Sequence, residues 1–319
     1  MKKPANLILL LLLANSLSSQ NPFIEHMYTA DPSAHVFSGR VYVYPSHDRD
    51  NSVTFDMMDY HVFSSANMVD WTDHGMVLSL EDVTWATRDA WAPDCGYSNG
   101  KYYFYFPTDQ SCIGVAVSDN PAGPFRDGLG KPLVTKNSPG VVNKRDFIDP
   151  SIFIDDDGTP YLFFGQLDVN VVQLNPDMIS YDGPVHIIEG AKDFFEAVWV
   201  HRYKGKYYLS YSTWGEKGVS GPQIVYATSE NVLGPYEYQG VILDEVSSGT
   251  NHHSIVQFKD QWYLFYHTSD LFAERTDSNS AEYKYKPYRR SICVDRLFYH
   301  EDGTIQKVVP TRTGVETVE

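Results

Sequence analysis

Three acidic side chains, Asp31, Asp149 and Glu196, stand 11 or 12 residues before the tyrosine of an aromatic strand motif that recurs along the chain. Trp91 and His252 occupy the corresponding place before two further copies of the motif. Hydrolysis of a glycosidic bond needs one carboxylic acid to protonate the leaving oxygen and one carboxylate to activate water or attack carbon. A third carboxylate raises the pKa of the acid and keeps it protonated, and a Trp ring offers a flat apolar face to a sugar.

The elements that must position these residues are five short strands rich in Tyr and Phe, with the anchors Tyr42, Tyr103, Tyr161, Tyr208 and Tyr263 at spacings of 61, 58, 47 and 55 residues. Each follows an apolar segment and a two-residue turn signal, which contains Gly in all but the last copy, so each unit opens on a β-hairpin. A strand-only repeat near 55 residues, without a sustained helical period, is typical of propeller blades. The prediction is an all-β fold, a five-bladed β-propeller. A β-sandwich is the alternative, but it does not require evenly spaced hairpins.

Simpler interpretations exist for each of these residues taken alone. Asp31 and Asp149 both precede a proline and could start turns. His252 is followed by His253, and such histidines are more often structural than catalytic. Glu196 lies among large apolar residues, which is unusual for a solvated Glu. The functional hypothesis rests on the shared position of all five residues in successive units.

Composition and charge restrict the partners and the location of the protein. The 319 residues include 41 Asp plus Glu and 25 Lys plus Arg, a net charge of −16, which disfavours binding to nucleic acid. Residues 1–19 combine Lys2-Lys3, an apolar run and small polar residues, so they predict a signal peptide with no membrane anchor. We therefore expect export to the periplasm or the outside, and one catalytic domain over residues 20–319.

The chain has three cysteines, Cys95, Cys112 and Cys293, and an odd number excludes a complete set of intramolecular disulfides. Three buried free thiols are expected, with a Cys95–Cys112 bridge as the alternative in an oxidising compartment. Without a Cys-x-x-Cys pair, a thiolate zinc site has almost no support.

Several motifs resemble those of glycoside hydrolase family 43 over about Tyr28 to Pro310. They are Ala30-Asp31-Pro32-Ser33, Asp59-Tyr60-His61-Val62-Phe63-Ser64-Ser65, Trp71-Thr72-Asp73-His74-Gly75, Trp91-Ala92-Pro93-Asp94, Phe147-Ile148-Asp149-Pro150-Ser151, Phe195-Glu196-Ala197 and Asn251-His252-His253-Ser254. The resemblance implies a five-bladed β-propeller and an inverting enzyme that acts on β-D-xylosides, α-L-arabinofuranosides or arabinan, and thus on pentose-containing oligo- or polysaccharides.

The resemblance also implies roles for single residues. Asp31 resembles the general base, Glu196 the general acid, and Asp149 the carboxylate that tunes and orients the acid. Arg290 resembles the arginine that contacts the terminal sugar, with its neighbour Arg289 as a rival. His252, with His253 as a rival, resembles the histidine near the axis, where some members hold Ca²⁺ through water. No cofactor is expected for the chemistry, and no metal ligand is assigned.

Other functions and the choice of substrate remain open at this point. A fructan-cleaving propeller would carry Asn-Asp-Pro-Asn and Arg-Asp-Pro, whereas this chain has Ala-Asp-Pro-Ser and Ile-Asp-Pro-Ser. A sugar-binding propeller without catalysis could lose any carboxylate, and a protein-interaction propeller usually has no axial acid cluster. Trp85, Trp214 and the tract 270–287 could line the mouth of the pocket that separates xylose from arabinofuranose, although both Trp residues could equally pack between blades.

Overall fold

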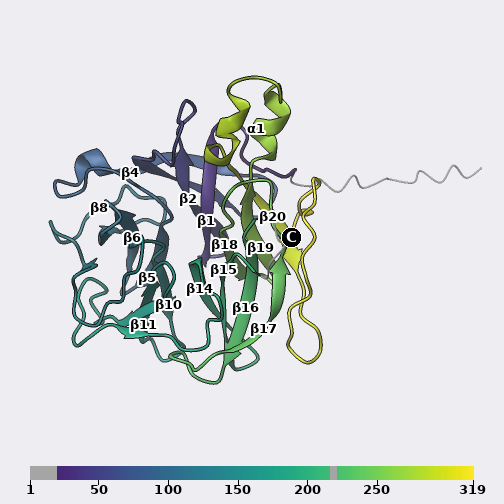
Figure 1. Cartoon of the computed structure of the whole chain (residues 1–319). Coiled ribbons are helices and arrows are strands. Elements are labelled where there is room, and N and C mark those ends of the chain that lie inside the picture. Colours follow the sequence, from purple (N-terminus) through teal and green to yellow (C-terminus); the bar gives the residue numbers. More distant parts are fainter. Residues whose placement is uncertain (1–19, 216–220) are drawn as a thin grey trace, which may run out of the picture.

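The structure, a computed structural model, describes residues 20–215 and 221–319, so the predicted signal peptide lies outside the described residues. Five antiparallel sheets surround a common centre, as Figure 1 shows. Blade 1 contains β1 (Tyr28–Phe37), β2 (Arg40–Asp48), β3 (Asp59–Ser65) and β4 (Thr72–Ser79). Blade 2 contains β5 (Asp94–Ser98), β6 (Lys101–Thr108), β7 (Cys112–Ser118), β8 (Arg126–Asp127) and the short β9 (Val134–Thr135).

The remaining three blades follow the same order along the chain. Blade 3 contains β10 (Ser151–Ile154), β11 (Pro160–Phe164), β12 (Asn170–Gln173) and β13 (His186–Ile187). Blade 4 contains β14 (Glu196–Tyr203), β15 (Lys206–Thr213), β16 (Gln223–Ser229) and β17 (Glu237–Leu243), and blade 5 contains β18 (His253–Phe258), β19 (Gln261–Thr268) and β20 (Ser291–Leu297). The inner strands β1, β5, β10, β14 and β18 contact one another in this cyclic order. The predicted five-bladed propeller is therefore confirmed.

Each blade opens on the hairpin that the sequence predicts, and the anchor tyrosines lie on the second strand of each. Asn99 and Gly100 form a two-residue turn with φ of 51° and 78°, the left-handed geometry that favours Asn-Gly. Blade 3 differs from the prediction. Its first ladder ends at the pair Ile154 and Pro160, so residues 155–159 form a wider loop than the expected two-residue turn.

The aromatic runs are explained by the burial of both faces of the second strand in each blade. Phe104 and Phe106 of β6 pack against blade 1, whereas Tyr103 and Tyr105 of the same strand pack against blade 3. Successive side chains of a strand point to opposite faces. A strand whose blade packs against a neighbouring blade on each side therefore has no polar face. Five such apolar clusters, one between each pair of neighbouring blades, form the core of the described residues.

The ring is closed by the start of the described chain. The backbone N–H of Phe23 donates to Ile292 O and that of Thr29 donates to Arg290 O, while the Asn21 side chain accepts from Val294 N and donates to Val294 O. Residues 21–29 thus run beside β20 and cover the outer edge of the three-stranded fifth blade. A covered edge offers no free backbone groups for pairing with another chain.

Within residues 20–215 and 221–319, helical structure is confined to short segments: the 3₁₀ turn η1 (Leu80–Asp82), the helix α1 (Asp270–Arg275) and the 3₁₀ turn η2 (Tyr283–Tyr288). In the part of the chain that the structure describes, no helix has the length and apolar character needed to cross a bilayer. All three cysteines are free, so the alternative Cys95–Cys112 bridge does not form. The expectation of three buried thiols is wrong for Cys112, which is half-buried at the start of β7.

Candidate active site

One cavity of about 380 Å³ brings together all six residues that the sequence singled out. Asp31, Asp149 and Glu196 line it together with Trp91, His252 and Arg290. The other lining residues are Phe55, Met57, Ala92, Arg145, Asp146, Ile148, Gln166, Phe195, Trp214, Gly249, Thr250, Pro287 and Tyr288. The three carboxylates line the same cavity and are each at most 9% exposed, so they are largely withdrawn from water.

The three acids lie at or next to a backbone irregularity that recurs in blades 1, 3 and 4. Asp31, Asp149 and Ala197 have φ of 51°, 57° and 62°, and each lies four residues before the partner of an anchor tyrosine. In blades 1 and 4 this residue belongs to a β-bulge that shifts the ladder by one residue. The prediction that Glu196 is structurally equivalent to Asp31 and Asp149 is therefore wrong by one residue, because Ala197 occupies the equivalent position in blade 4. The same holds in blade 2, where Ala92 occupies this position and Trp91 precedes it. Bulges re-aim side chains, which is how Glu196 still reaches the pocket.

Asp31 is surrounded by hydrogen-bond donors and positive charge. Its Oδ1 accepts from Arg290 Nη1 at 2.8 Å and its Oδ2 accepts from Ser46 Oγ at 2.6 Å. Burial alone would raise the pKa of this carboxyl, but the charges of Arg290, His267 and His252 and the Ser46 hydrogen bond lower the pKa to about 2. Asp31 is thus ionised across the whole neutral range.

Arg290, rather than its neighbour Arg289, is the arginine in the pocket. Its guanidinium makes a two-pronged contact with Asp48, with Nε to Oδ2 at 2.9 Å and Nη2 to Oδ1 at 2.8 Å, so its plane is fixed while Nη1 reaches Asp31. Arg289 points elsewhere, with its guanidinium 4.9 Å from the Phe272 ring centre and its Nε bonded to Asp50 O.

Glu196 and Asp149 form the opposite side of the pocket. Gln166 Nε2 donates to Glu196 Oε2 at 2.7 Å, and the backbone N–H of Ala197, next in sequence, donates to Asp149 Oδ2 at 2.8 Å. Burial and the nearby Asp31 charge together raise the pKa of Glu196 to about 7, against the opposing effect of the Gln166 hydrogen bond. Burial together with the nearby Glu196 and Asp31 charges also raises the pKa of Asp149. The pair therefore retains a proton near neutral pH.

The two adjacent histidines have different places. His252 Nδ1 lies 3.8 Å from Asp31 Oδ1 and 3.9 Å from Asp149 Oδ2, so one imidazole stands between the two carboxylates. His253 is buried behind the pocket and its Nε2 contacts Ser210 Oγ at 2.6 Å. A third histidine, His267, accepts from the Asp31 backbone N–H through Nδ1, and burial lowers its pKa to about 3.

Aromatic side chains form the rim of the pocket. Trp91 is held by a hydrogen bond from Nε1 to Phe55 O at 2.9 Å, and Phe55 packs edge-on against Tyr288. Trp214 also lines the rim and is 49% exposed. Trp85 instead packs on Phe106 in the apolar cluster between blades 1 and 2 and does not line the pocket. Of the tract 270–287, only Pro287 reaches the pocket.

The sequence reasoning missed Asp48 and Gln166, although both hold a residue of the pocket. Asp48 is 1% exposed and lies at the end of β2, 242 residues before its partner Arg290. Gln166 follows β11 closely, and Ser46, which bonds Asp31, lies near the end of β2. The usable signal was position, since polar residues near the end of the second strand lie beside the acids at or near the start of the first strand.

The channel behind the pocket, where some proteins with the motifs described above hold Ca²⁺ through water, contains few oxygen ligands for a directly bound ion. Asp94 is the one carboxylate among the residues that line this space. Its Oδ1 accepts from Ser33 Oγ and lies at 2.5 Å from His35 Nε2, and its Oδ2 accepts from Ile152 N at 2.6 Å. Because Ca²⁺ takes about six to eight oxygen ligands, these residues do not fit a directly coordinated calcium ion.

The arrangement combines one carboxylate that is ionised at neutral pH with a carboxyl that can still carry a proton there. An ionised carboxylate can take a proton from water, and a protonated carboxyl can give one to a leaving oxygen. Trp91 and the other aromatic side chains at the rim supply apolar faces. The cavity can therefore carry out acid–base hydrolysis on a small, ring-shaped, polyhydroxylated group.

Comparisons with known proteins agree with this geometry. The model of the family "Glycosyl hydrolases family 43" matches residues 19–305. A xylosidase/arabinosidase of Humicola insolens is 36% identical, over 89% of this chain and 98% of its own length, and one of Bacteroides ovatus is 38% identical, over 87% and 94%. The crystal structure of a β-xylosidase/α-arabinofuranosidase from a compost microbial metagenome, in complex with xylotriose and calcium-free, has a TM-score of 0.78 at 39% identity over 91% and 97%. The chain belongs to glycosyl hydrolases family 43 and is a glycoside hydrolase.

Proposed function

We propose that this enzyme hydrolyses pentosyl linkages, α-L-arabinofuranosides, β-D-xylosides or both, in plant-type polysaccharides or their oligosaccharides. The observation that carries the proposal is the contrast inside one cavity between Asp31, whose pKa is held near 2, and Glu196, whose pKa is raised to about 7. The relatives named above as xylosidases and arabinosidases support the choice of a pentose.

In the proposed mechanism Asp31 is the general base. Arg290 and Ser46 keep its carboxylate ionised and fixed in orientation, and it removes a proton from the water that attacks the anomeric carbon. Glu196 is the general acid that protonates the leaving oxygen. Attack by water on the face opposite the leaving group inverts the configuration, and inverting enzymes separate the two carboxyl groups by roughly 6.5–9.5 Å to admit that water.

Asp149 and the remaining pocket residues support these two. Asp149 and Glu196 repel each other when both are ionised, so the pair together holds a proton near neutral pH, and the hydrogen bond from Ala197 N fixes Asp149 beside Glu196. We assign Trp91, Arg290 and His252 to contacts with the bound sugar. The proton transfers need no cofactor, because the carboxyl groups supply both.

The test has two parts on the same preparation. Rates on matched p-nitrophenyl β-D-xylopyranoside and α-L-arabinofuranoside would establish pentoside hydrolysis and its preference, and would separate the enzyme from a propeller that only binds sugar. NMR of the first-formed sugar should show inversion at the anomeric carbon. Net retention would overturn the roles of Asp31 and Glu196, and no sugar release from any pentoside would overturn the substrate.

We further propose that residues 1–19 are a cleaved signal peptide, that residues 20–319 are the mature catalytic domain, and that the enzyme is exported. Support comes from the basic Lys2-Lys3 and the apolar run after it. Cleavage after residue 19 would also leave Asn21 intact, which the ring closure uses. Mass spectrometry of the mature amino terminus tests this, and a retained Met1 would contradict it.

A further inference from the structure

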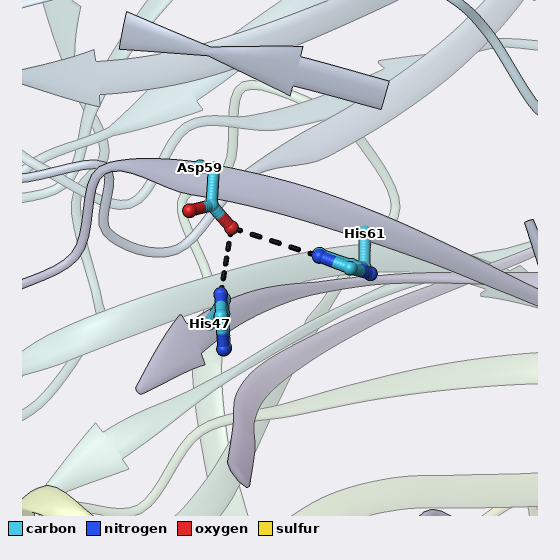
Figure 2. A group of neighbouring side chains, drawn as sticks. All are labelled: His47, Asp59 and His61. Atoms are coloured by element: carbon cyan, nitrogen blue, oxygen red, sulfur yellow. Dashed lines mark hydrogen bonds and ion pairs between the residues drawn. The ribbon is translucent and has the colours of Figure 1, made fainter. Parts of the chain in front are cut away.

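A second group of ionisable side chains lies on blade 1, outside the catalytic pocket. His47 lies near the carboxyl end of β2, and Asp59 and His61 lie on the neighbouring strand β3 (Figure 2). Asp59 Oδ1 lies 2.6 Å from His47 Nδ1 and 3.8 Å from His61 Nε2. One donor atom of each side chain lies within 4.8 Å of the other two. None of the three lines the cavity that contains Asp31 and Glu196.

We propose that His47, Asp59 and His61 bind a divalent transition-metal ion, of which Zn²⁺ fits best. Two imidazole nitrogens and one carboxylate oxygen are donors that Zn²⁺ accepts, whereas Ca²⁺ and Mg²⁺ prefer sites made of oxygen alone. The three side chains are 17–21% exposed, so an ion can enter from solvent and water can complete its coordination.

A neighbouring carboxylate is placed to support His61. The Nδ1 atom of His61 is buried without a hydrogen-bond partner among the described residues, and it faces Asp73 Oδ1 at 3.8 Å. Asp73 is itself held in place, because it accepts from Gly75 N at 2.7 Å and its other oxygen contacts His26 Nε2 at 2.8 Å. Histidines that bind metals through one nitrogen usually direct the other at a carboxylate or carbonyl, and this geometry is half-formed here.

Binding requires only small movements. Ligand atoms around a tetrahedral Zn²⁺, with bonds of about 2.0–2.2 Å, stand roughly 3.3–3.6 Å apart. The His47–Asp59 contact must therefore open slightly, and His61 must approach Asp59. The bound ion would link β2 to β3 and so stabilise blade 1, in which Asp48 follows His47 directly and holds Arg290.

The experiment uses the untagged full enzyme after treatment with EDTA. Zn²⁺ is titrated by calorimetry, and Co²⁺ is titrated by visible absorption, which reports the coordination geometry independently of activity. We expect one ion per chain, Co²⁺ bands typical of nitrogen and oxygen ligands, and a rise of a few degrees in the Tm at saturating Zn²⁺.

Variants separate this site from adventitious binding. Asp59→Asn and His61→Gln should each weaken Zn²⁺ binding by at least tenfold, and Asp73→Asn by about tenfold through the orientation of His61. His186→Gln, at an exposed histidine of β13, is the matched control and should bind as the parent does. Near-UV circular dichroism in EDTA verifies that each variant is folded, and His47→Ala replaces any variant that is not. Absence of stoichiometric binding, or equal affinity in the folded ligand variants and the parent, would overturn the proposal.

Discussion

The two sides of the catalytic pocket hold carboxyl groups of the same chemistry in opposite surroundings. On the side of blades 1 and 5, Asp31 receives two short hydrogen bonds, one of them from the Arg290 guanidinium. On the side of blades 3 and 4, Glu196 receives one hydrogen bond from the neutral Gln166, and no lysine or arginine of the described residues forms an ion pair with it or with Asp149. Burial is similar on both sides, so the partners decide which acid keeps its proton.

The largest expected effect comes from removing the acid and the base separately. Glu196→Gln should lower kcat on a pentose disaccharide by roughly 10³-fold, but far less on a p-nitrophenyl pentoside, whose leaving group needs little protonation. Asp31→Asn should lower kcat by roughly 10³-fold on both substrates, because the attacking water needs the base in either case. Steady-state kinetics with the two substrates checks the contrast, and equal losses for both variants on both substrates would contradict the assignment.

The next effect is on stability. Arg290→Met should lower the free energy of unfolding by about 3–5 kcal/mol at neutral pH, because Asp48 and Asp31 would remain buried without their cation. Arg289→Met is the matched control, and loss of its contact with Phe272 should cost about 1 kcal/mol. Urea unfolding followed by fluorescence measures both, and similar costs for the two variants would show that the Asp48–Arg290–Asp31 contacts are not special.

A smaller effect concerns the pH profile. We expect kcat/KM of the parent enzyme to fall above about pH 7, as Glu196 loses its proton. The Gln166 hydrogen bond stabilises the ionised form of Glu196 and lowers its pKa, so Gln166→Leu should move this alkaline limb to higher pH. Gln173→Leu, at an exposed residue of β12, should leave the limb where it is. A shift to lower pH in Gln166→Leu would reverse the sign assigned to this contact.

The smallest effect is expected at the rim. Trp214→Ala should raise KM for pentose oligosaccharides about fivefold and leave kcat unchanged, because the exposed ring lines the pocket without contacting either acid. Tyr238→Ala removes an exposed aromatic ring outside the pocket and should change neither constant. A drop in kcat for Trp214→Ala would indicate that the rim also orients the reacting bond.

The fold could be predicted because its signals are local. Each hairpin contains its own turn residues. The second strand of each blade carries a five-residue run of mostly apolar side chains, which indicates that both of its faces are buried. Two departures from the prediction come from backbone irregularities that composition does not reveal. The bulge at Ala197 moves Glu196 by one residue relative to Asp149, and a wider loop replaces the turn at Gly158.

The acids of the site could be placed from the sequence because each lies near the start of the first strand of its hairpin, within one residue of the same position. Their electrostatic partners could not, because these come from other parts of the chain. Asp48 meets Arg290 across 242 residues, and the choice between Arg289 and Arg290 depends on which side chain turns inward at the start of β20. His252 and His253 pose the same problem, since adjacent residues at a strand end point in opposite directions.

The closure of the ring by residues 21–29 has a consequence for biosynthesis. Asn21 and its partner Val294 are separated by 273 positions, so the first described residues leave the ribosome long before the strand that receives them exists. The four inter-blade clusters that do not involve the junction of blades 5 and 1 can assemble in order as the chain emerges. The cluster between blades 5 and 1, and with it the contact between Arg290 and Asp31, can form only after β20 has been translated. The enzyme can therefore become active only once nearly all of the chain has been made.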